Sequence, residues 1–503
     1  MTTHTMASAA RRARLAVPAL AVLACASNGE HPGTTAGRQA IAAPPAAPTP
    51  LELGSCTAPG WDGEARCGSY AVPLDHADPD GRSIEVSVVV LPATGDEPAA
   101  DPIFFIQGGP GGSTASLIPL AGPMGAIHAA RDLVFLDQRG TGGSHALKCD
   151  VSTPDDVLEV VYGLSLEDRV GSCIAGLAGL DPALFTTAAA VEDLEIVRHA
   201  LGYERVNLWA GSYGTRVALA FARRHPGSVR TMYLRGVAGT DYRLPLLFAR
   251  GAQDALDTLA ADCAQSEACT ALGDLRETLD RVALRVRKDP ALAPVPGAAG
   301  AATGESVTIT EDVLLGGIRF LLYDPSWSAL IPGILAAADG GDFGPFLQIA
   351  LPLGLGLRSQ FSFGMTLAVV CAEDLPRIRE TQVGPSSAGT FLGDRVIRGL
   401  QRTCAAWPAS AAPEGFHRPV ASDIPTLAIT GALDPVTPEA SATEALAGLS
   451  NVLHLVFANL GHSPPFTPCV LGLYGRFLEA GSIDGLDDCG EGPPRPPFPG
   501  AGP

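Results

Sequence analysis

Three side chains suited to acyl-transfer chemistry follow one another along the chain: Ser212, Asp434 and His462. Ser212 lies in "LWAGSYGTRVAL", where an apolar strand-like run ends in a small turn and a helical run begins. That setting is typical of the nucleophile elbow G-x-S-x-G, with Ala210 in place of the first glycine and Gly214 as the second. In such a set the histidine takes the serine proton, and the aspartate fixes the histidine tautomer.

Each partner of Ser212 also follows a strand-like run. Asp434 comes after "IPTLAITG" and His462 after "VLHLVF". Taken alone, the serine fits an ordinary turn, the Asp-Pro pair fits a turn, and a lone histidine says little. Reactive side chains gather at the carboxyl ends of parallel strands, so the order and placement together predict a catalytic triad.

A glycine-rich loop, "FFIQGGPGGS" at residues 104–113, follows another strand-like run. It lacks the G-K-[ST] of a phosphate-binding loop, and Pro110 removes one donor N–H. We expect the backbone N–H groups of Gly109 and Tyr213 to form an oxyanion hole, with Gly108 as the alternative to Gly109.

Short apolar strands alternate with helical patterns on both sides of these loops, which indicates an α/β fold with a mostly parallel central sheet flanked by helices. Residues 241–365 lose this alternation and predict an inserted, mainly helical cap. The core then comprises residues 51–240 and 366–490. The expected strands are at 84–91, 102–107, 132–137, 206–210, 231–236, 424–431 and 452–457.

The N-terminus has the form of an export signal. Three arginines between residues 11 and 14 precede an apolar run too short to span a bilayer, which ends in "VLAC". Residues 1–25 predict a lipoprotein-type signal with Cys25 as the lipidated residue; an ordinary secretory signal is the alternative. Residues 26–50 predict a flexible Pro/Ala-rich tether, and residues 491–503 a disordered tail.

Ten cysteines remain besides Cys25, and an even number in an exported chain indicates disulfides. Ten cysteines allow about 945 pairings. Their spacing falls into local couples, and no zinc-like spacing is present, so we expect neither a metal nor a cofactor. The consecutive pairs are Cys56–Cys67, Cys149–Cys173, Cys263–Cys269, Cys371–Cys404 and Cys469–Cys489.

The net charge of −19 argues against nucleic acid as a partner, because nucleic acid requires a basic face. The same charge argues against attraction to anionic lipid. We therefore expect membrane association only through the lipid anchor, in a cell-envelope lipoprotein or a secreted protein.

The ordered set "QGGPGGS", "DLVFLDQRGTGGS", "LWAGSYGTRVAL", "ITGALDPVTP" and "NLGHS…CV" resembles the proline-iminopeptidase-like branch of the α/β hydrolases. Within that branch it is most similar to the secreted tripeptidyl-aminopeptidases. The departures are Ala210 and Gln107, which stands where the family has histidine. The resemblance implies a serine aminopeptidase that releases short units from peptides with free N-termini. We also expect a monomer.

An aminopeptidase needs a carboxylate for the substrate amine. Glu373 is the first choice and Asp374 the second, since both lie where the cap rejoins the core; solvated loop charges are the alternative. Asp137 precedes the serine, the wrong order for the triad acid, so we expect it to form a buried pair with Arg139 that braces nearby loops.

Two other functions remain open. An esterase or lipase for small acyl esters would use the same fold and triad. A non-enzymatic envelope binding protein on an inactive hydrolase scaffold would not need the complete set of Ser212, Asp434 and His462.

Overall fold

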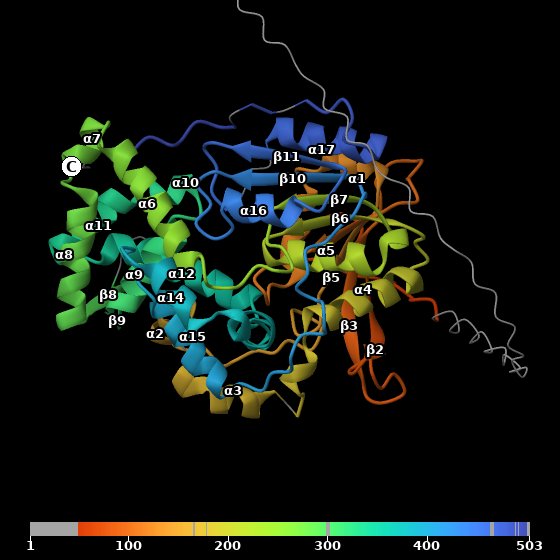
Figure 1. The fold of residues 1–503 in the computed structure, drawn as a ribbon, viewed down its shortest axis with the longest axis horizontal. Coiled ribbons are helices and arrows are strands. Elements are labelled where there is room, and N and C mark those ends of the chain that lie inside the picture. The colour runs from red at the N-terminus through yellow and green to blue at the C-terminus, as the bar shows by residue number, and fades with distance from the viewer. Residues whose placement is uncertain are drawn as a thin grey trace, which may run out of the picture. The chain divides into compact units, whose positions relative to one another are not determined.

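A nine-stranded sheet forms the centre of the computed structural model (Figure 1). The structure describes residues 49–163, 166–177, 179–297, 302–462, 467–487, 489–490 and 492–499. The strands lie in the order β1-β2-β3-β5-β4-β6-β7-β10-β11. Their bounds are β1 Gly54–Ser55, β2 Arg66–Pro73, β3 Ser83–Leu91, β4 Ile103–Ile106, β5 Leu133–Leu136, β6 Val206–Gly211, β7 Val229–Arg235, β10 Thr426–Gly431 and β11 Val452–Phe457.

The first strands of the sheet pair antiparallel, and the six from β5 to β11 run parallel. All seven strands expected from apolar runs are present, which confirms the mostly parallel sheet. Because the parallel strands share one direction, the loops after β4, β6, β10 and β11 emerge at the same edge.

Alternate side chains of the buried strands pack into two separate hydrophobic cores, one on each face of the sheet. Trp209 of β6 packs on one face with residues of α17, such as Phe477. Leu208 packs on the other face with α5, for example with Phe221. This period of two is expected for a strand buried on both faces. The flanking helices are α1 Gly125–Ala130, α4 Thr187–Ala200, α5 Tyr213–Arg224, α16 Glu439–Leu446 and α17 Pro468–Ala480.

Helices between β7 and β10 group at the side to which β10 and β11 point (Figure 1). We call residues 248–369 the cap. A two-stranded antiparallel hairpin interrupts its helices. The elements are α6 Phe248–Cys263, α7 Glu267–Thr270, α8 Leu275–Lys288, β8 Ala291–Pro296, β9 Ala302–Ile309, α9 Glu311–Leu321, α10 Pro325–Ser328, α11 Ile331–Asp339, α12 Gly344–Gln360 and α13 Phe363–Val369.

Segments outside the expected cap of residues 241–365 pack on it. Tyr162 Oη donates to the Ala350 carbonyl of α12 at 2.6 Å, and Asp155 accepts from the N–H of Thr308 in β9 at 2.7 Å. Residues near 160, expected within the first part of the core, thus join the cap. The elements concerned are α2 Pro154–Leu158, α14 Glu380–Ser387 and α15 Arg395–Ala405, whereas α3 Val170–Gly176 is joined to Cys149 by a disulfide.

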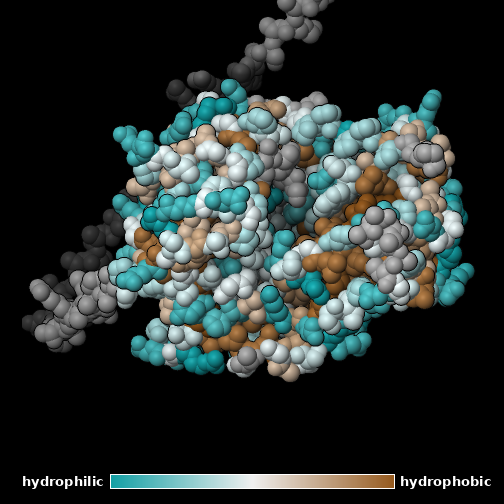
Figure 2. Space-filling model, turned by 180° about the vertical axis from the view of Figure 1, so that it is seen from behind, coloured by the Kyte–Doolittle hydropathy of each residue, from teal (hydrophilic) through white to brown (hydrophobic). Residues whose placement is uncertain are grey.

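Hydrophobic side chains reach the surface mainly on the cap. Among the described residues, the large exposed ones are Leu284 in α8, Leu292 in β8 and Leu355 in α12. Figure 2 shows the molecule from behind, so that the cap lies on the right. Hydrophobic residues gather on that side. Within the described residues, no helix is both long and apolar enough to cross a membrane.

The structure contains the five disulfides expected between consecutive cysteines. The expectation of a disordered tail at residues 491–503 is wrong for its central part. Arg495 forms an ion pair with Asp262 of α6, and its Nε lies 3.2 Å from Asn459 Oδ1. Cys25 and the 1–48 segment lie outside the described residues, so the signal and the tether stay predictions.

Candidate active site

Ser212 stands on a sharp turn between β6 and α5. Its φ of 54° is one of two positive values at non-glycine residues within the described part of the chain, so the turn is strained. The Ser212 N–H donates to the Arg235 carbonyl of β7 at 2.9 Å, and Thr215 donates to the Ser212 carbonyl. A Cβ on Gly214 would lie 2.3 Å from the Ile106 carbonyl oxygen, so glycine is required there. Ala210, by contrast, is buried within β6.

The structure brings the three residues of the expected triad together. His462 Nε2 lies 3.0 Å from Ser212 Oγ, and His462 Nδ1 lies 2.8 Å from Asp434 Oδ2. Asp434 is buried, whereas the His462 side chain is 12% exposed. With Nδ1–H donating to the carboxylate, Nε2 is free to accept the serine proton.

The carboxylate of Asp434 is held in its ionised form. Burial by itself would raise its pKa, but the charge and hydrogen bond of His462 and two hydrogen bonds from Thr437 outweigh burial. The pKa of Asp434 therefore lies below its usual value. Thr437 Oγ1 donates to Oδ2 at 2.7 Å, and the backbone N–H groups of Val436 and Thr437 donate to Oδ1. These donors also fix the orientation of the carboxylate.

The residues expected to form the oxyanion hole lie beside the serine. A Cβ on Gly108 would be 2.8 Å from Ser212 Cβ and 3.2 Å from Tyr213 N, so the loop after β4 touches the elbow. The Gly108 N–H already donates to Gln107 Oε1 at 2.9 Å. Among the described residues, the N–H groups of Gly109 and Tyr213 have no acceptor. This difference favours Gly109 over Gly108, and the assignment stays a prediction.

Comparison with known proteins gives the same fold. Residues 101–324 match the family described as alpha/beta hydrolase fold, and residues 389–489 match the one described as TAP-like protein. The chain is an α/β hydrolase. The match to the TAP-like family confirms the resemblance to the tripeptidyl-aminopeptidase branch, and the arrangement at Ser212 is that of a serine hydrolase.

Three curated relatives carry peptidase or esterase names. The serine protease Hip1 of Mycobacterium tuberculosis is 27% identical over 438 residues, 80% of this chain and 82% of the relative. Carboxylesterase B of the same species is 28% identical over 496 residues, 86% of this chain and 91% of the relative. Tripeptidyl aminopeptidase of Streptomyces lividans is 28% identical over 402 residues, 74% of this chain and 66% of the relative.

In this hydrolase Glu373 and Asp374 do not reach an open pocket, so the expected amine anchor does not fit the geometry. Both are buried at 1% and 0% exposure. Asp374 pairs with Arg216 of α5, and the Glu373 carboxylate accepts from the N–H and hydroxyl of Thr187, each at 2.7 Å. Burial raises the pKa of Glu373, which Arg216 and Thr187 only partly offset. Their hydrogen-bonding capacity is used within the protein.

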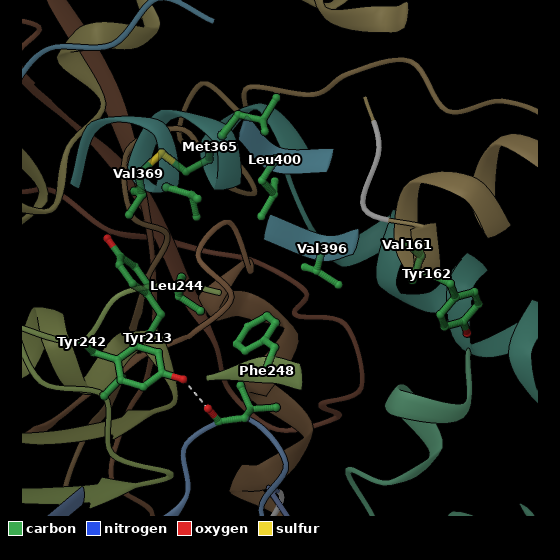
Figure 3. Packing of buried hydrophobic residues seen from close by; sticks show 14 of the residues in the cluster. Val161, Tyr162, Tyr213, Tyr242, Leu244, Phe248, Met365, Val369, Val396 and Leu400 are labelled. Carbon is green, nitrogen blue, oxygen red and sulfur yellow. Dashed lines mark hydrogen bonds between the residues drawn. The ribbon is translucent and has the colours of Figure 1, made fainter. Parts of the chain in front are cut away.

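Thr187 also connects Glu373 to Tyr213, the residue after the nucleophile. The Tyr213 hydroxyl lies 2.7 Å from Thr187 Oγ1. Burial raises the pKa of Tyr213, so its phenol is neutral. Tyr213, Tyr242 and Leu244 belong to one cluster of buried hydrophobic residues (Figure 3). The single arginine in the apolar run "TRVALAF" is the sequence signal from which the buried partner of the two carboxylates could have been predicted.

Asp137 and Arg139 are both buried, but they do not pair with each other. Arg139 forms its ion pair with Asp193 of α4. Asp137 instead accepts from the Ser113 hydroxyl at 2.9 Å and from the N–H of Gly143 at 2.8 Å. The expected pair is therefore wrong, although Asp137 does brace the glycine-rich loop.

Two cap segments touch the site. The backbone N–H of His462 donates to the Tyr323 carbonyl at 2.8 Å, and the rings of the two residues meet edge to face. A Cβ on Gly109 would lie 2.8 Å from the Phe361 ring. Among the described residues, no group of three or more His, Cys, Asp or Glu is arranged to hold a metal ion.

Proposed function

We propose that this α/β hydrolase is a serine exopeptidase that cleaves peptides near free N-termini through an acyl-enzyme on Ser212. The observation that carries the acyl-enzyme chemistry is the continuous Ser212–His462–Asp434 hydrogen-bond chain at 3.0 and 2.8 Å. Support for peptide substrates comes from relatives named serine protease and tripeptidyl aminopeptidase.

The geometry supports a two-step reaction. Ser212 Oγ attacks the substrate carbonyl carbon while His462 Nε2 takes its proton. The oxyanion then accepts hydrogen bonds from the N–H groups of Gly109 and Tyr213. His462 returns the proton to the departing amine, which leaves an ester on Ser212. Water, deprotonated by His462, hydrolyses this ester and frees the serine.

An esterase acting on small acyl esters is the second candidate. The relative named carboxylesterase B matches over 91% of its length. The burial of Glu373 and Asp374 also removes the carboxylates first considered for the substrate amine. An ester substrate would use the same triad without needing an amine anchor.

Matched substrates separate the two candidates. A tripeptide amide with a free N-terminus, its N-acetylated form and a short-chain ester are assayed with the wild-type protein and with Ser212→Ala. The exopeptidase proposal expects cleavage of the free peptide, little of the acetylated one, and a loss of about 10⁶-fold in kcat for Ser212→Ala. Equal cleavage of the free and acetylated peptides, or turnover of the ester alone, would reject it.

We further propose export with a lipid anchor on Cys25. The five disulfides support an oxidising compartment. Labelled palmitate supplied to expressing cells should enter the wild-type protein and not Cys25→Ser. Label in both proteins, or in neither, would reject the anchor.

A further inference from the structure

The cap is bound directly to the glycine-rich loop after β4. Ser362 donates its N–H to the Gly111 carbonyl, and Ser113 donates its N–H to the Gln360 carbonyl, each at 2.9 Å. Between these bonds Phe361 and Gly112 form an isolated antiparallel bridge. The end of α12 and the loop thus pair like two short strands.

Thr366, in the first turn of α13, adds a side-chain contact at the centre of the loop. Its hydroxyl donates to the Pro110 carbonyl at 2.6 Å. A Cβ on Gly111 would lie 2.6 Å from the Ser362 carbonyl oxygen and 2.9 Å from Thr366 Oγ1, so the two backbones are in close contact.

The loop contains two glycines in backbone conformations that other residues rarely adopt. Gly109 and Gly111, on either side of Pro110, have φ values of 123° and 105°, and glycine reaches such values without steric cost. The 108–109 peptide, which carries the Gly109 N–H, is held by Gly112, whose N–H donates to the Gly108 carbonyl at 3.0 Å, and Gly112 is in turn held by its bridge to Phe361 of the cap. Asp137 fixes the end of the loop through Ser113, and the cap fixes the middle.

We propose that Thr366 is a positioning residue for the reaction. By holding the Pro110 carbonyl it keeps the Gly109 N–H directed at the oxygen that becomes negative during attack by Ser212. This inference rests on the proposed function, because it assigns Gly109 to the oxyanion hole. Its consequence is that the cap, besides covering the site, takes part in setting the geometry of oxyanion stabilisation.

An oxyanion donor acts on the transition state far more than on the bound substrate. Removing such a donor costs about 10²- to 10³-fold in kcat. Thr366→Val, which keeps the shape but loses the hydroxyl, displaces the donor. We therefore expect a fall in kcat of about 10-fold with KM unchanged. Thr366→Ser retains the hydroxyl and should restore kcat.

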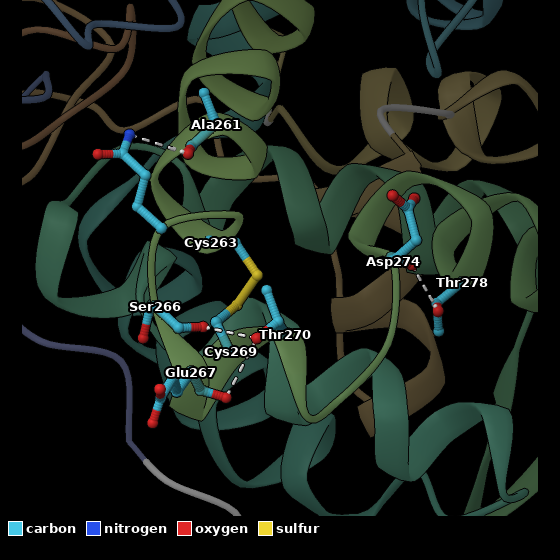
Figure 4. Close-up of a disulfide and its surroundings, with 9 residues drawn as sticks. Ala261, Cys263, Ser266, Glu267, Cys269, Thr270, Asp274 and Thr278 are labelled. Carbon is cyan, nitrogen blue, oxygen red and sulfur yellow. Dashed lines mark hydrogen bonds between the residues drawn. A yellow bond between two sulfur atoms is a disulfide. The ribbon is translucent and has the colours of Figure 1, made fainter.

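A matched control lies in α8, at the end of the cap away from the sheet. Thr278 Oγ1 donates to the Asp274 carbonyl at 2.7 Å, beside the Cys263–Cys269 disulfide (Figure 4). Thr278→Val loses a hydroxyl-to-carbonyl hydrogen bond of similar length, together with the bond that Thr278 Oγ1 accepts from Arg281 at 3.0 Å, but should keep wild-type kcat. The melting temperatures of all variants, with Thr366→Ala as a second variant, distinguish a protein that fails to fold from one in which only the Gly109 N–H is displaced.

The experiment measures kcat and KM on whichever substrate the protein turns over, and the affinity of a peptidyl boronate that occupies the oxyanion hole. Support is an equal loss of kcat and boronate affinity in Thr366→Val, recovered in Thr366→Ser. Wild-type kcat in a folded Thr366→Val, a change in KM alone, or the same loss in Thr278→Val would overturn the proposal. Full turnover by Ser212→Ala would instead reject the proposed function itself.

Discussion

Arg216 and Asp374 form a bidentate ion pair that joins the nucleophile helix to the segment leaving the cap. Arg216 Nη2 lies 2.9 Å from Asp374 Oδ1, and Nη1 lies 3.1 Å from Oδ2. Neither side chain is exposed to solvent. Since Arg216 is four residues after Ser212 in α5, the pair ties the cap junction to the helix that presents the nucleophile.

Breaking this pair should destabilise the protein strongly. Asp374→Asn leaves the buried guanidinium of Arg216 with only the more distant carboxylate of Glu373, at 3.3 Å. Removing one partner of a buried ion pair costs about 3–5 kcal/mol. Denaturant unfolding measures this loss, and a change below about 1 kcal/mol would show that the pair behaves like a surface salt bridge.

Glu373 should make stability depend on pH in a direction opposite to that of an ordinary paired carboxylate. Its pKa is raised by burial, so the folded state binds the proton more tightly than the unfolded state. Stability then falls as pH rises from the unfolded value of about 4.3 through the raised folded value. Glu373→Gln lacks this ionisation, so its stability relative to the wild-type protein should increase from pH 4 to pH 8.

Thermal melts at both pH values check this expectation. Glu380→Gln serves as the control because Glu380 is exposed and its pKa is lowered by Arg398; a lowered pKa gives the opposite slope. A constant difference between wild-type protein and Glu373→Gln across this range would contradict the prediction. Because Glu373 does not reach substrate, KM for free peptides should also stay unchanged.

The sequence predicted the parallel strands well because each is a short, mainly apolar run before a turn. The strand β2, by contrast, alternates exposed and partly buried residues and contains Gly68, so its pattern is weak. The hairpin of β8 and β9 includes two prolines, which disfavour a strand in sequence patterns. The strand β2 and the β8–β9 hairpin form through pairing with a neighbouring strand, which a local sequence pattern does not predict.

The triad was predictable for a similar reason: each member follows a strong strand at the same edge. The role of Glu373 was not predictable. The sequence places Glu373 and Asp374 near the site, but it does not show that Arg216 pairs with Asp374 or that Thr187 donates to Glu373. The contact of Thr366 with Pro110 joins residues 256 positions apart. Such contacts follow from how the cap packs on the core.

The two small positions of the elbow should respond differently to substitution. Gly214→Ala places a methyl 2.3 Å from the Ile106 carbonyl oxygen, at the base of the glycine-rich loop. We expect a loss of about 1–3 kcal/mol in stability together with a large fall in kcat. Ala210→Gly should cost only about 0.5–1 kcal/mol and retain activity. Unfolding midpoints and kcat measure both, and equal effects of the two variants would reject this account.

Asp434→Asn should remove activity while leaving the fold intact. The amide N–H₂ would face His462 Nδ1 and favour the tautomer protonated on Nε2, which cannot accept the Ser212 proton. We expect kcat to fall about 10⁴-fold with KM little changed. Thr437→Val removes one hydrogen bond to Asp434 Oδ2 and should cause a smaller fall. A loss in Thr437→Val as large as that in Asp434→Asn would contradict the tautomer argument.

The disulfides should differ in their contribution to stability according to the length of chain they close. Cys371–Cys404 spans 33 residues and Cys263–Cys269 only 6. Closing the longer loop removes more entropy from the unfolded chain, so replacing the first pair by alanine should cost about 1.5 kcal/mol more than replacing the second. Denaturant unfolding of the two double variants measures the difference, with the free-thiol content checked in each. A larger loss from the shorter loop would mean that strain or packing in the folded state outweighs chain entropy.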